Sequence, residues 1–61
     1  MTKLTQKELE SINEKLANES ELIEKFRCFA GECDDKKLSE LCKSTADIHQ
    51  KHFNMLVSYL R

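Results

Sequence analysis

The chain has 61 residues, no proline and one glycine, and 34% of its residues are charged. A chain of this length forms at most one domain, residues 1–61, and its composition favours long helices over a sheet or a loop-rich fold. The formal net charge is -1 and both signs are interspersed, so the sequence lacks the basic stripe that binds nucleic acid.

No apolar run of the sequence approaches the roughly 20 residues that span a bilayer. The segment after Met1 is polar, unlike the apolar core of a secretory signal peptide. We therefore expect synthesis in the cytoplasm and no membrane partner.

The first predicted helix covers about residues 6–30. Thr5 and Glu8 have the spacing of a capping box, in which each side chain accepts a hydrogen bond from the other residue's backbone N–H. No helix-breaking residue follows until Gly31, which we expect to end the helix in the left-handed conformation.

An apolar seam with steps of three and four residues, typical of a helical bundle, runs along this helix. Its members are Leu9, Ile12, Leu16, Ile23, Phe26 and Ala30, and Leu22 and Phe29 widen it on one side. One position of the seam is a carboxylate, Glu19. The width of the seam predicts that the helix contacts more than one neighbour.

The turn is predicted at residues 31–35 and the second helix at about residues 36–60. Asp35 is the expected N-cap, with Asp34 as the alternative, and both carboxylates suit the positive end of the helix dipole. Because the connection is short, the two helices are expected to be antiparallel neighbours.

The second helix also has a wide apolar face. One frame centres it on Leu38, Cys42, Thr45, His49, His52, Leu56 and Tyr59. The residues on either side of this centre are Leu41, Ile48 and Met55, and Ala46, Phe53 and Leu60. Two helices alone cannot enclose a core. We therefore predict an all-α antiparallel two-helix hairpin that forms a homodimer with the architecture of a four-helix bundle.

Polar residues interrupt both seams at nearly the same height. Side chains on a helix lean toward its N-terminus, so Glu19 and His49 converge, and His52 lies one turn further along. A carboxylate and two imidazoles have the ligand chemistry of a divalent-metal half-site, for zinc or iron. The alternative is a structural layer that fixes helix register, in which the histidines pair with Glu19 or with Thr45 and Tyr59.

The three cysteines form the spacing C-x4-C-x8-C, which matches no zinc pattern. An odd number disfavours a disulfide-framed secreted domain. We expect three free thiols, with Cys42 on the core face and Cys28 and Cys33 near the turn. A Cys28–Cys33 disulfide, or an intermolecular one, is the alternative.

Four stretches combine into one recognisable pattern: Glu19–Glu24, Lys25–Ala30, Leu38–Cys42 and, most specifically, His49–Leu56. This pattern resembles small spore coat proteins of the Coat F type, which occur in endospore-forming clostridia and bacilli. Those proteins are similar to the ferritin-like superfamily, whose four-helix bundles often bind two metals. The resemblance implies a half-bundle that dimerises, and other coat proteins as partners.

Ferritin-like di-iron sites take a Glu from one helix and a Glu-x-x-His motif from the next. By this resemblance Glu19 matches the first element and His49 matches the histidine of the motif. The Glu of the motif falls on Ala46, which cannot ligate a metal, and His52 is an additional histidine. The departure argues against ferroxidase chemistry.

The leading functional prediction is a small non-enzymatic structural or assembly protein, made in the cytoplasm and similar to spore coat components. The alternative is a ferritin-like metal-binding or redox bundle with a Glu/His site in its core. A helical adaptor within a larger assembly is a further alternative. An enzyme is disfavoured because a hairpin offers no substrate cleft, and a divalent metal is the only cofactor for which the sequence offers ligands.

Overall fold

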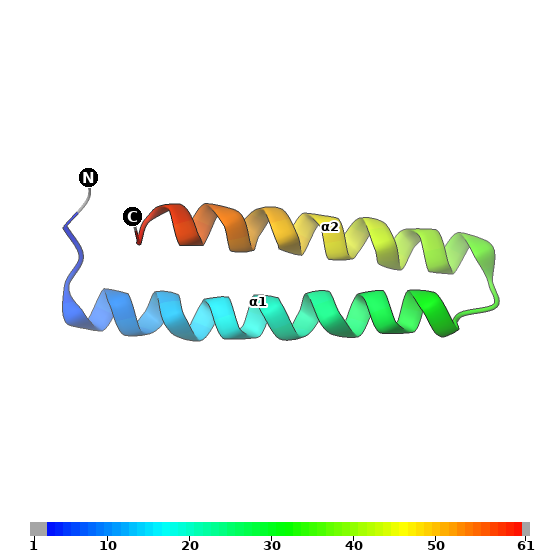
Figure 1. Ribbon diagram of the computed structural model, residues 1–61, viewed down its shortest axis with the longest axis horizontal. Helices are drawn as coiled ribbons and strands as arrows, with labels where there is room; N and C mark the ends of the chain where they lie inside the picture. The colour runs from blue at the N-terminus through cyan, green and yellow to red at the C-terminus, as the bar shows by residue number, and fades with distance from the viewer. Residues whose placement is uncertain (1–2, 61) are drawn as a thin grey trace.

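The computed structural model describes residues 3–60 and forms an antiparallel helical hairpin (Figure 1). Helix α1 spans Gln6–Glu32 and helix α2 spans Lys36–Ser58, and the two pack against each other along their length. The predicted all-α hairpin is thereby confirmed. Residues 1, 2 and 61, the ends of the predicted domain, lie outside the described residues.

The predicted capping box begins α1. The backbone N–H of Glu8 donates to Thr5 Oγ1 at 3.1 Å, and the backbone N–H of Thr5 donates to Glu8 Oε1 at 3.0 Å. Two of the N–H groups that a helix leaves without partners are thus satisfied at this terminus. On the exposed side of α1, Glu21 and Lys25 form the i, i+4 ion pair that their spacing indicates, at 3.0 Å.

The end of α1 differs from the prediction. Gly31 is helical, the helix continues to Glu32, and no residue from 3 to 60 has a positive φ. Cys33 instead ends the helix in an extended conformation. The hydroxyl of Ser39 donates to the carbonyl of Ala30 at 2.7 Å, so a side chain of α2 satisfies an end carbonyl that a left-handed glycine would otherwise help to satisfy.

Helix α2 begins where predicted and ends two residues early. The Asp35 side chain accepts from the backbone N–H of Leu38 at 2.9 Å, which makes Asp35 rather than Asp34 the N-cap. After Ser58 the chain tightens, because the N–H groups of residues 59 and 60 bond three residues back, to the carbonyls of residues 56 and 57. Tighter bonding of this kind is common in the last turn of a helix.

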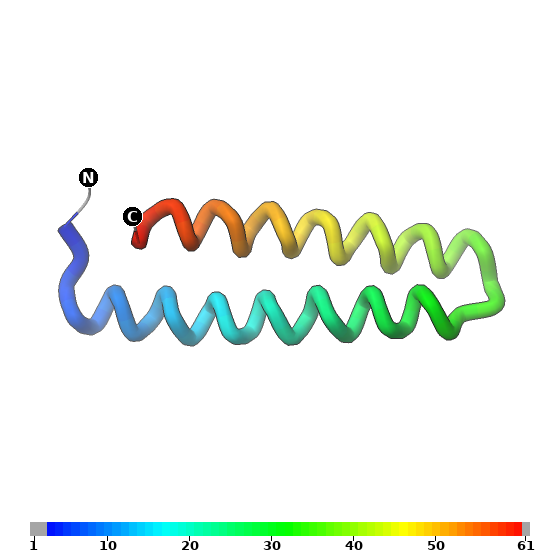
Figure 2. Tube along the Cα trace, viewed as in Figure 1, coloured from blue at the N-terminus to red at the C-terminus, as the bar shows by residue number. Residues whose placement is uncertain are grey.

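The hairpin is elongated, as the trace shows (Figure 2). Its Cα radius of gyration is 14.3 Å and its extents are 46 × 17 × 11 Å. A compact domain of this length would have a radius of gyration of about 10–11 Å. Between residues 3 and 60, neither helix has the length and apolar character needed to cross a membrane.

The buried core of the hairpin is small. Four residues are buried among those described: Ile23, Ala30, Cys42 and Ala46. The face of α2 that packs on α1 is rotated from its predicted centre, toward Ala46 and Phe53 and away from Leu38 and Tyr59. Three of the four buried residues have small side chains, and only Ile23 is large.

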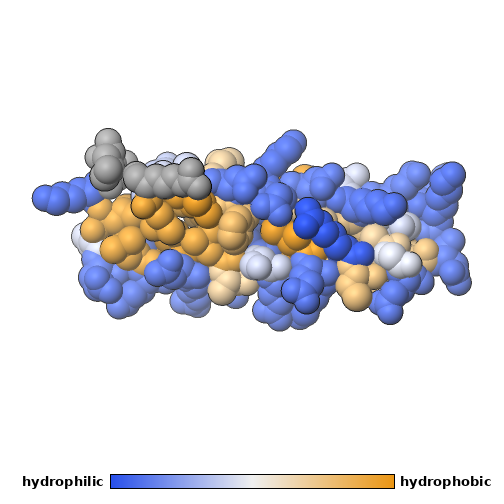
Figure 3. All heavy atoms as spheres, viewed as in Figure 1, coloured by the Kyte–Doolittle hydropathy of each residue, from blue (hydrophilic) through white to orange (hydrophobic). Residues whose placement is uncertain are grey.

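One broad side of the hairpin stays apolar and uncovered, and we call it the open face. Its exposed members are Leu22 and Phe29 from α1, Leu41, Ile48 and Met55 from α2, and Tyr59 at the C-terminal end of α2. Leu41, Ile48 and Met55 recur every seven residues and are 61%, 52% and 63% exposed. The space-filling view shows the other side of the hairpin, on which apolar side chains gather near the chain ends and hydrophilic side chains cover much of the half toward the turn (Figure 3).

The three cysteines are free thiols, and only Cys42 is buried. Replacement of Cys42 by serine places a hydroxyl in the core, so Cys42→Ser should lower the free energy of unfolding by about 1–2 kcal/mol. Cys28→Ser, on an exposed position of α1, should be nearly neutral and serves as the matched control. Urea unfolding measures both, and equal losses would contradict this assignment.

The capping box predicts a pH dependence. Hydrogen bonds from the Thr5 backbone, and then from its side chain, hold the pKa of the Glu8 carboxyl below its ordinary value. A carboxyl whose pKa is lower when folded contributes stability above its unfolded pKa, and the contribution disappears as the pH falls through the folded pKa. Glu8→Gln keeps the shape without the charge, so it should destabilise the protein at neutral pH and match wild type in acid.

Urea unfolding at a series of pH values and one chain concentration tests this expectation. Glu14→Gln, further along α1 and outside the capping box, is the control and should follow wild type at every pH. A stability difference between wild type and Glu8→Gln that persists unchanged into acid would refute the pH dependence.

Candidate metal centre

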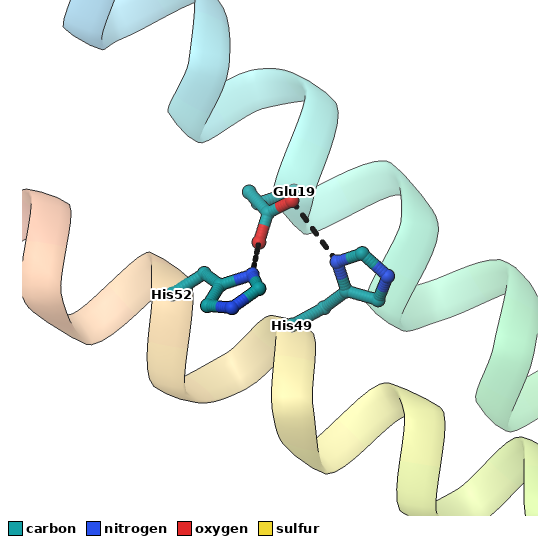
Figure 4. A network of polar contacts seen from close by, with 3 residues as sticks. All are labelled: Glu19, His49 and His52. Carbon is teal, nitrogen blue, oxygen red and sulfur yellow. Dashed lines mark hydrogen bonds and ion pairs between the residues drawn. The ribbon is translucent and has the colours of Figure 1, made fainter.

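The polar layer predicted from the sequence forms at the middle of the hairpin. Glu19 extends from the central turns of α1 toward α2, and His49 and His52 extend from successive turns of α2 toward Glu19 (Figure 4). The i, i+3 spacing places the two rings on neighbouring positions of one helix surface. The carboxylate therefore meets both rings at once.

Each oxygen of the Glu19 carboxylate faces one imidazole. His49 Nδ1 lies 3.0 Å from Oε1, in hydrogen-bond geometry, and His52 Nδ1 lies 3.3 Å from Oε2. One potential ligand atom from each of the three residues lies within 4.8 Å of the other two. No other group of three such side chains is brought together within residues 3–60.

The second oxygen of the Glu19 carboxylate lacks a hydrogen-bond donor among the described residues. Glu19 Oε2 is buried, and within the described part of the chain it has no hydrogen-bond partner. The His52 contact is close enough for an ion pair, but its angles are not those of a hydrogen bond. A buried carboxylate oxygen without a donor is costly, so this position favours a cation or a better-placed donor.

Neighbouring rings hold His49 in position. The ring of Phe26 stacks on it with 5.9 Å between centroids and 10° between planes. His52 meets it edge-on, with 5.7 Å between centroids and 88° between planes. The stacking contact supports the ring that carries the shortest bond to Glu19. Phe26 was assigned only to the apolar seam, although its position seven residues after Glu19 places it beside the site.

The two histidines differ in exposure, which corrects the prediction that both lie on the buried face. The side chains of Glu19 and His49 are 16% and 22% exposed, whereas that of His52 is 52% exposed. A groove of about 410 Å³ runs beside the carboxylate, lined by Lys15, Asn18, Glu19, His52, Met55 and Leu56. Because Met55 belongs to the open face, the site can be reached from that side.

Other residues considered for the layer do not join it. The hydroxyl of Thr45 donates to the carbonyl of Leu41 in its own helix at 2.9 Å, so its proton is not available to an imidazole. Tyr59 lies beyond the last turn of α2 and is exposed. Ala46 is completely buried against α1, so apolar packing occupies the place where a ferritin-like motif has its second-helix carboxylate.

The arrangement has the ligand chemistry of a divalent transition metal. Zinc binds histidine nitrogen and carboxylate oxygen at about 2.0–2.2 Å, which separates tetrahedral ligand atoms by roughly 3–4 Å. The three side chains need only a small rearrangement to reach that spacing. Two imidazoles and one carboxylate also leave a coordination position open, as in metal sites that bind a water or a further ligand.

No family model, curated protein or solved structure matches the chain. The hairpin and the Glu19–His49–His52 cluster are therefore the features on which an interpretation of function depends. Glu19 and His49 meet as the sequence predicts, and His52 joins them from the edge of the open face.

Proposed function

We propose that this chain is a non-enzymatic assembly protein, two copies of which pair through their open faces into a four-helix bundle. The observation that carries the proposal is the open face itself. Its large apolar side chains recur at helical spacing on one side of the hairpin, whereas four of the residues from 3 to 60 are buried between the helices. Exposed apolar patches of this kind mark interaction surfaces.

The exposed area supports a second copy as the occupant. The chain exposes 5044 Å², whereas a compact monomer of 7.1 kDa exposes about 4,100 Å². The excess is close to the area of about 800 Å² that each partner contributes to a standard protein interface. A face that meets its own copy is covered on both chains at once, as in an isologous dimer.

The opposite side of the hairpin favours a closed pair rather than a chain of copies. Its groove is lined by the polar or charged side chains of Ser20, Glu24, Arg27 and Gln50, together with Ile23, Cys28 and Phe53. The polar side chains are compatible with water, and the heptad-spaced row of exposed Leu41, Ile48 and Met55 belongs to the open face. Two hairpins joined by one face each form a closed assembly, because neither retains a matching face for a third.

The resemblance to Coat F proteins supports a place for this pair in a spore coat, together with other coat proteins. Its most specific part, the His49–Leu56 stretch, includes both histidines of the polar layer and Met55 of the open face. In this proposal the hairpin pair is a building block, and the polar layer sets the register in which the helices pack.

Charge placed on the open face tests the pairing. Wild type should sediment at micromolar concentration with twice the mass of one chain, and Ile48→Glu should sediment as a monomer, because a carboxylate there would be buried against the partner. Asn54→Glu introduces the same side chain at an exposed position away from the open face and should still pair. A stable, cooperatively folding wild-type monomer would rule out the proposed dimer.

Metal binding is a second candidate function, favoured by the buried Glu19 Oε2 that lacks a hydrogen-bond partner among the described residues. A divalent ion bonded to this oxygen and to one nitrogen of each histidine would supply the missing partner. The ring protons and the ion compete for the same nitrogens, so binding releases protons. Because the cluster has one carboxylate, that of Glu19, the proposal is metal binding rather than ferroxidase chemistry.

Zinc should raise the melting temperature of apo protein, because a ligand that binds only the folded state stabilises it by mass action. At a free concentration one hundred times the dissociation constant the gain is about 2.7 kcal/mol, or roughly 10 °C or more for a domain of this size. The gain should be smaller in acid than at neutral pH, because a histidine binds metal through a nitrogen that carries no proton.

His49→Ala should remove most of this gain, since His49 makes the shortest contact with Glu19. Thermal unfolding followed by circular dichroism, with and without a chelator, provides the measurement. If zinc leaves the wild-type melting temperature unchanged at neutral pH, the layer is structural. The triple variant Glu19→Leu, His49→Leu, His52→Leu should then be at least as stable as wild type.

A further inference from the structure

We propose that metal binding and pairing are coupled in this protein, such that a divalent transition ion at Glu19, His49 and His52 tightens the association of two hairpins. The inference rests on both parts of the proposed function and adds a relation between them. It follows from the position of His52, which belongs to the polar cluster and to the surface that pairing would cover.

The spacing along α2 places His52 within the apolar stripe of the open face. It follows Ile48 by four residues and precedes Met55 by three, and all three side chains are more than half exposed. Leu41 and Tyr59 continue the same stripe at heptad-related positions. A second copy that covers Ile48 and Met55 must therefore also cover the ring of His52.

The groove beside the cluster shows that pairing would also cover the cluster from the α1 side. Lys15 and Asn18 line it on the α1 side, and His52, Met55 and Leu56 line it on the α2 side, with Glu19 between them. Leu22 follows Lys15 by seven residues and Asn18 by four, so it lies on the same side of α1. Pairing through Leu22 and Met55 would place the partner over the opening of the polar cluster.

The cost of covering this opening depends on whether an ion is bound. Without an ion, pairing removes from water the half-exposed imidazole of His52, and it closes off the neighbourhood of Glu19 Oε2, which is already buried without a hydrogen-bond donor in the described chain. Burial of polar groups without partners opposes association. A bound ion coordinates both Glu19 and His52, so the same surface can be covered with these groups already satisfied.

Coordination also orders His52 before the partner arrives. An exposed side chain that becomes immobile at an interface loses conformational freedom, which weakens binding. A ring already held between Glu19 and an ion has lost that freedom. The satisfied polar groups and the ordered His52 ring both favour association. The metal-loaded hairpin should therefore pair more tightly, by roughly tenfold, which lies within the usual range of coupling between two sites.

Sedimentation equilibrium of the full chain, under reducing conditions, measures the pairing constant with zinc and with a chelator. Zinc should lower the dissociation constant of the wild-type dimer by roughly tenfold. His52→Gln keeps a polar side chain in the stripe but removes the shared ligand, so its dimer should respond much less to zinc. The double variant Cys28→Ser, Cys33→Ser should respond like wild type, which excludes zinc bound by these thiols as the cause.

A second measurement requires no substitution. Coupling is reciprocal, and each dimer has two zinc sites. The wild-type chain should therefore bind zinc more tightly above the dimer dissociation constant than below it, by the square root of the tenfold change, roughly threefold per site. A chromogenic chelator that competes for zinc reports this affinity at both chain concentrations. It keeps the test decisive even if a variant does not fold.

The outcomes separate this inference from the proposed function. A wild-type dimer of equal strength in zinc and in chelator overturns the coupling and leaves the pairing intact. The same holds if His52→Gln responds to zinc as strongly as wild type does. A wild-type chain that remains monomeric in both buffers overturns the pairing and the coupling together. A chain that pairs but binds no zinc overturns metal binding and the coupling and leaves the assembly proposal standing.

Discussion

The contact of one carboxylate with two imidazoles is the interaction on which the middle of this hairpin depends. Glu19 occupies a seam position that would otherwise hold an apolar side chain, and it is largely covered by its own hairpin. A covered carboxylate requires nearby donors or a cation, and α2 supplies two imidazoles at successive turns. Any sliding of one helix past the other would separate these groups, so the contact favours a single register.

The small core explains why the rest of the surface matters. Between the turn and the polar layer, the small side chains of Ala30, Cys42 and Ala46 are buried by a single neighbouring helix. Large side chains such as Leu41, Ile48 and Met55 point away from that contact and remain exposed. Two helices cannot cover a wide apolar face, since each offers only one surface to the other. In the proposed dimer, a second copy would cover this apolar face without a longer chain.

The sequence predicts the helix N-caps correctly, because each depends on residues close together in the chain. The Thr5–Glu8 capping box and the Asp35 cap depend on residues three apart in the chain, and the structure contains both. The predicted left-handed conformation of Gly31 is wrong. It competes with a tertiary contact, in which the Ser39 hydroxyl donates to the Ala30 carbonyl. The meeting of Glu19 with His49 was predictable because residues equidistant from a short turn must face each other, and the structure adds the stacked ring of Phe26.

The sequence by itself determined the two helices, their antiparallel order, their N-caps and the polar interruption in both seams. These features follow from heptad spacing, capping chemistry and the length of the turn, all of which act between near neighbours or through simple symmetry about the turn. Only the tertiary structure decided the rotation of α2 about its own axis. That rotation sets Ala46 and Phe53 toward α1 and leaves Met55 and half of His52 on the open face. The predicted face of α2 and the observed face both place apolar residues toward α1, so the spacing of apolar residues does not distinguish them. The observed rotation depends on how closely small side chains let the two helices approach.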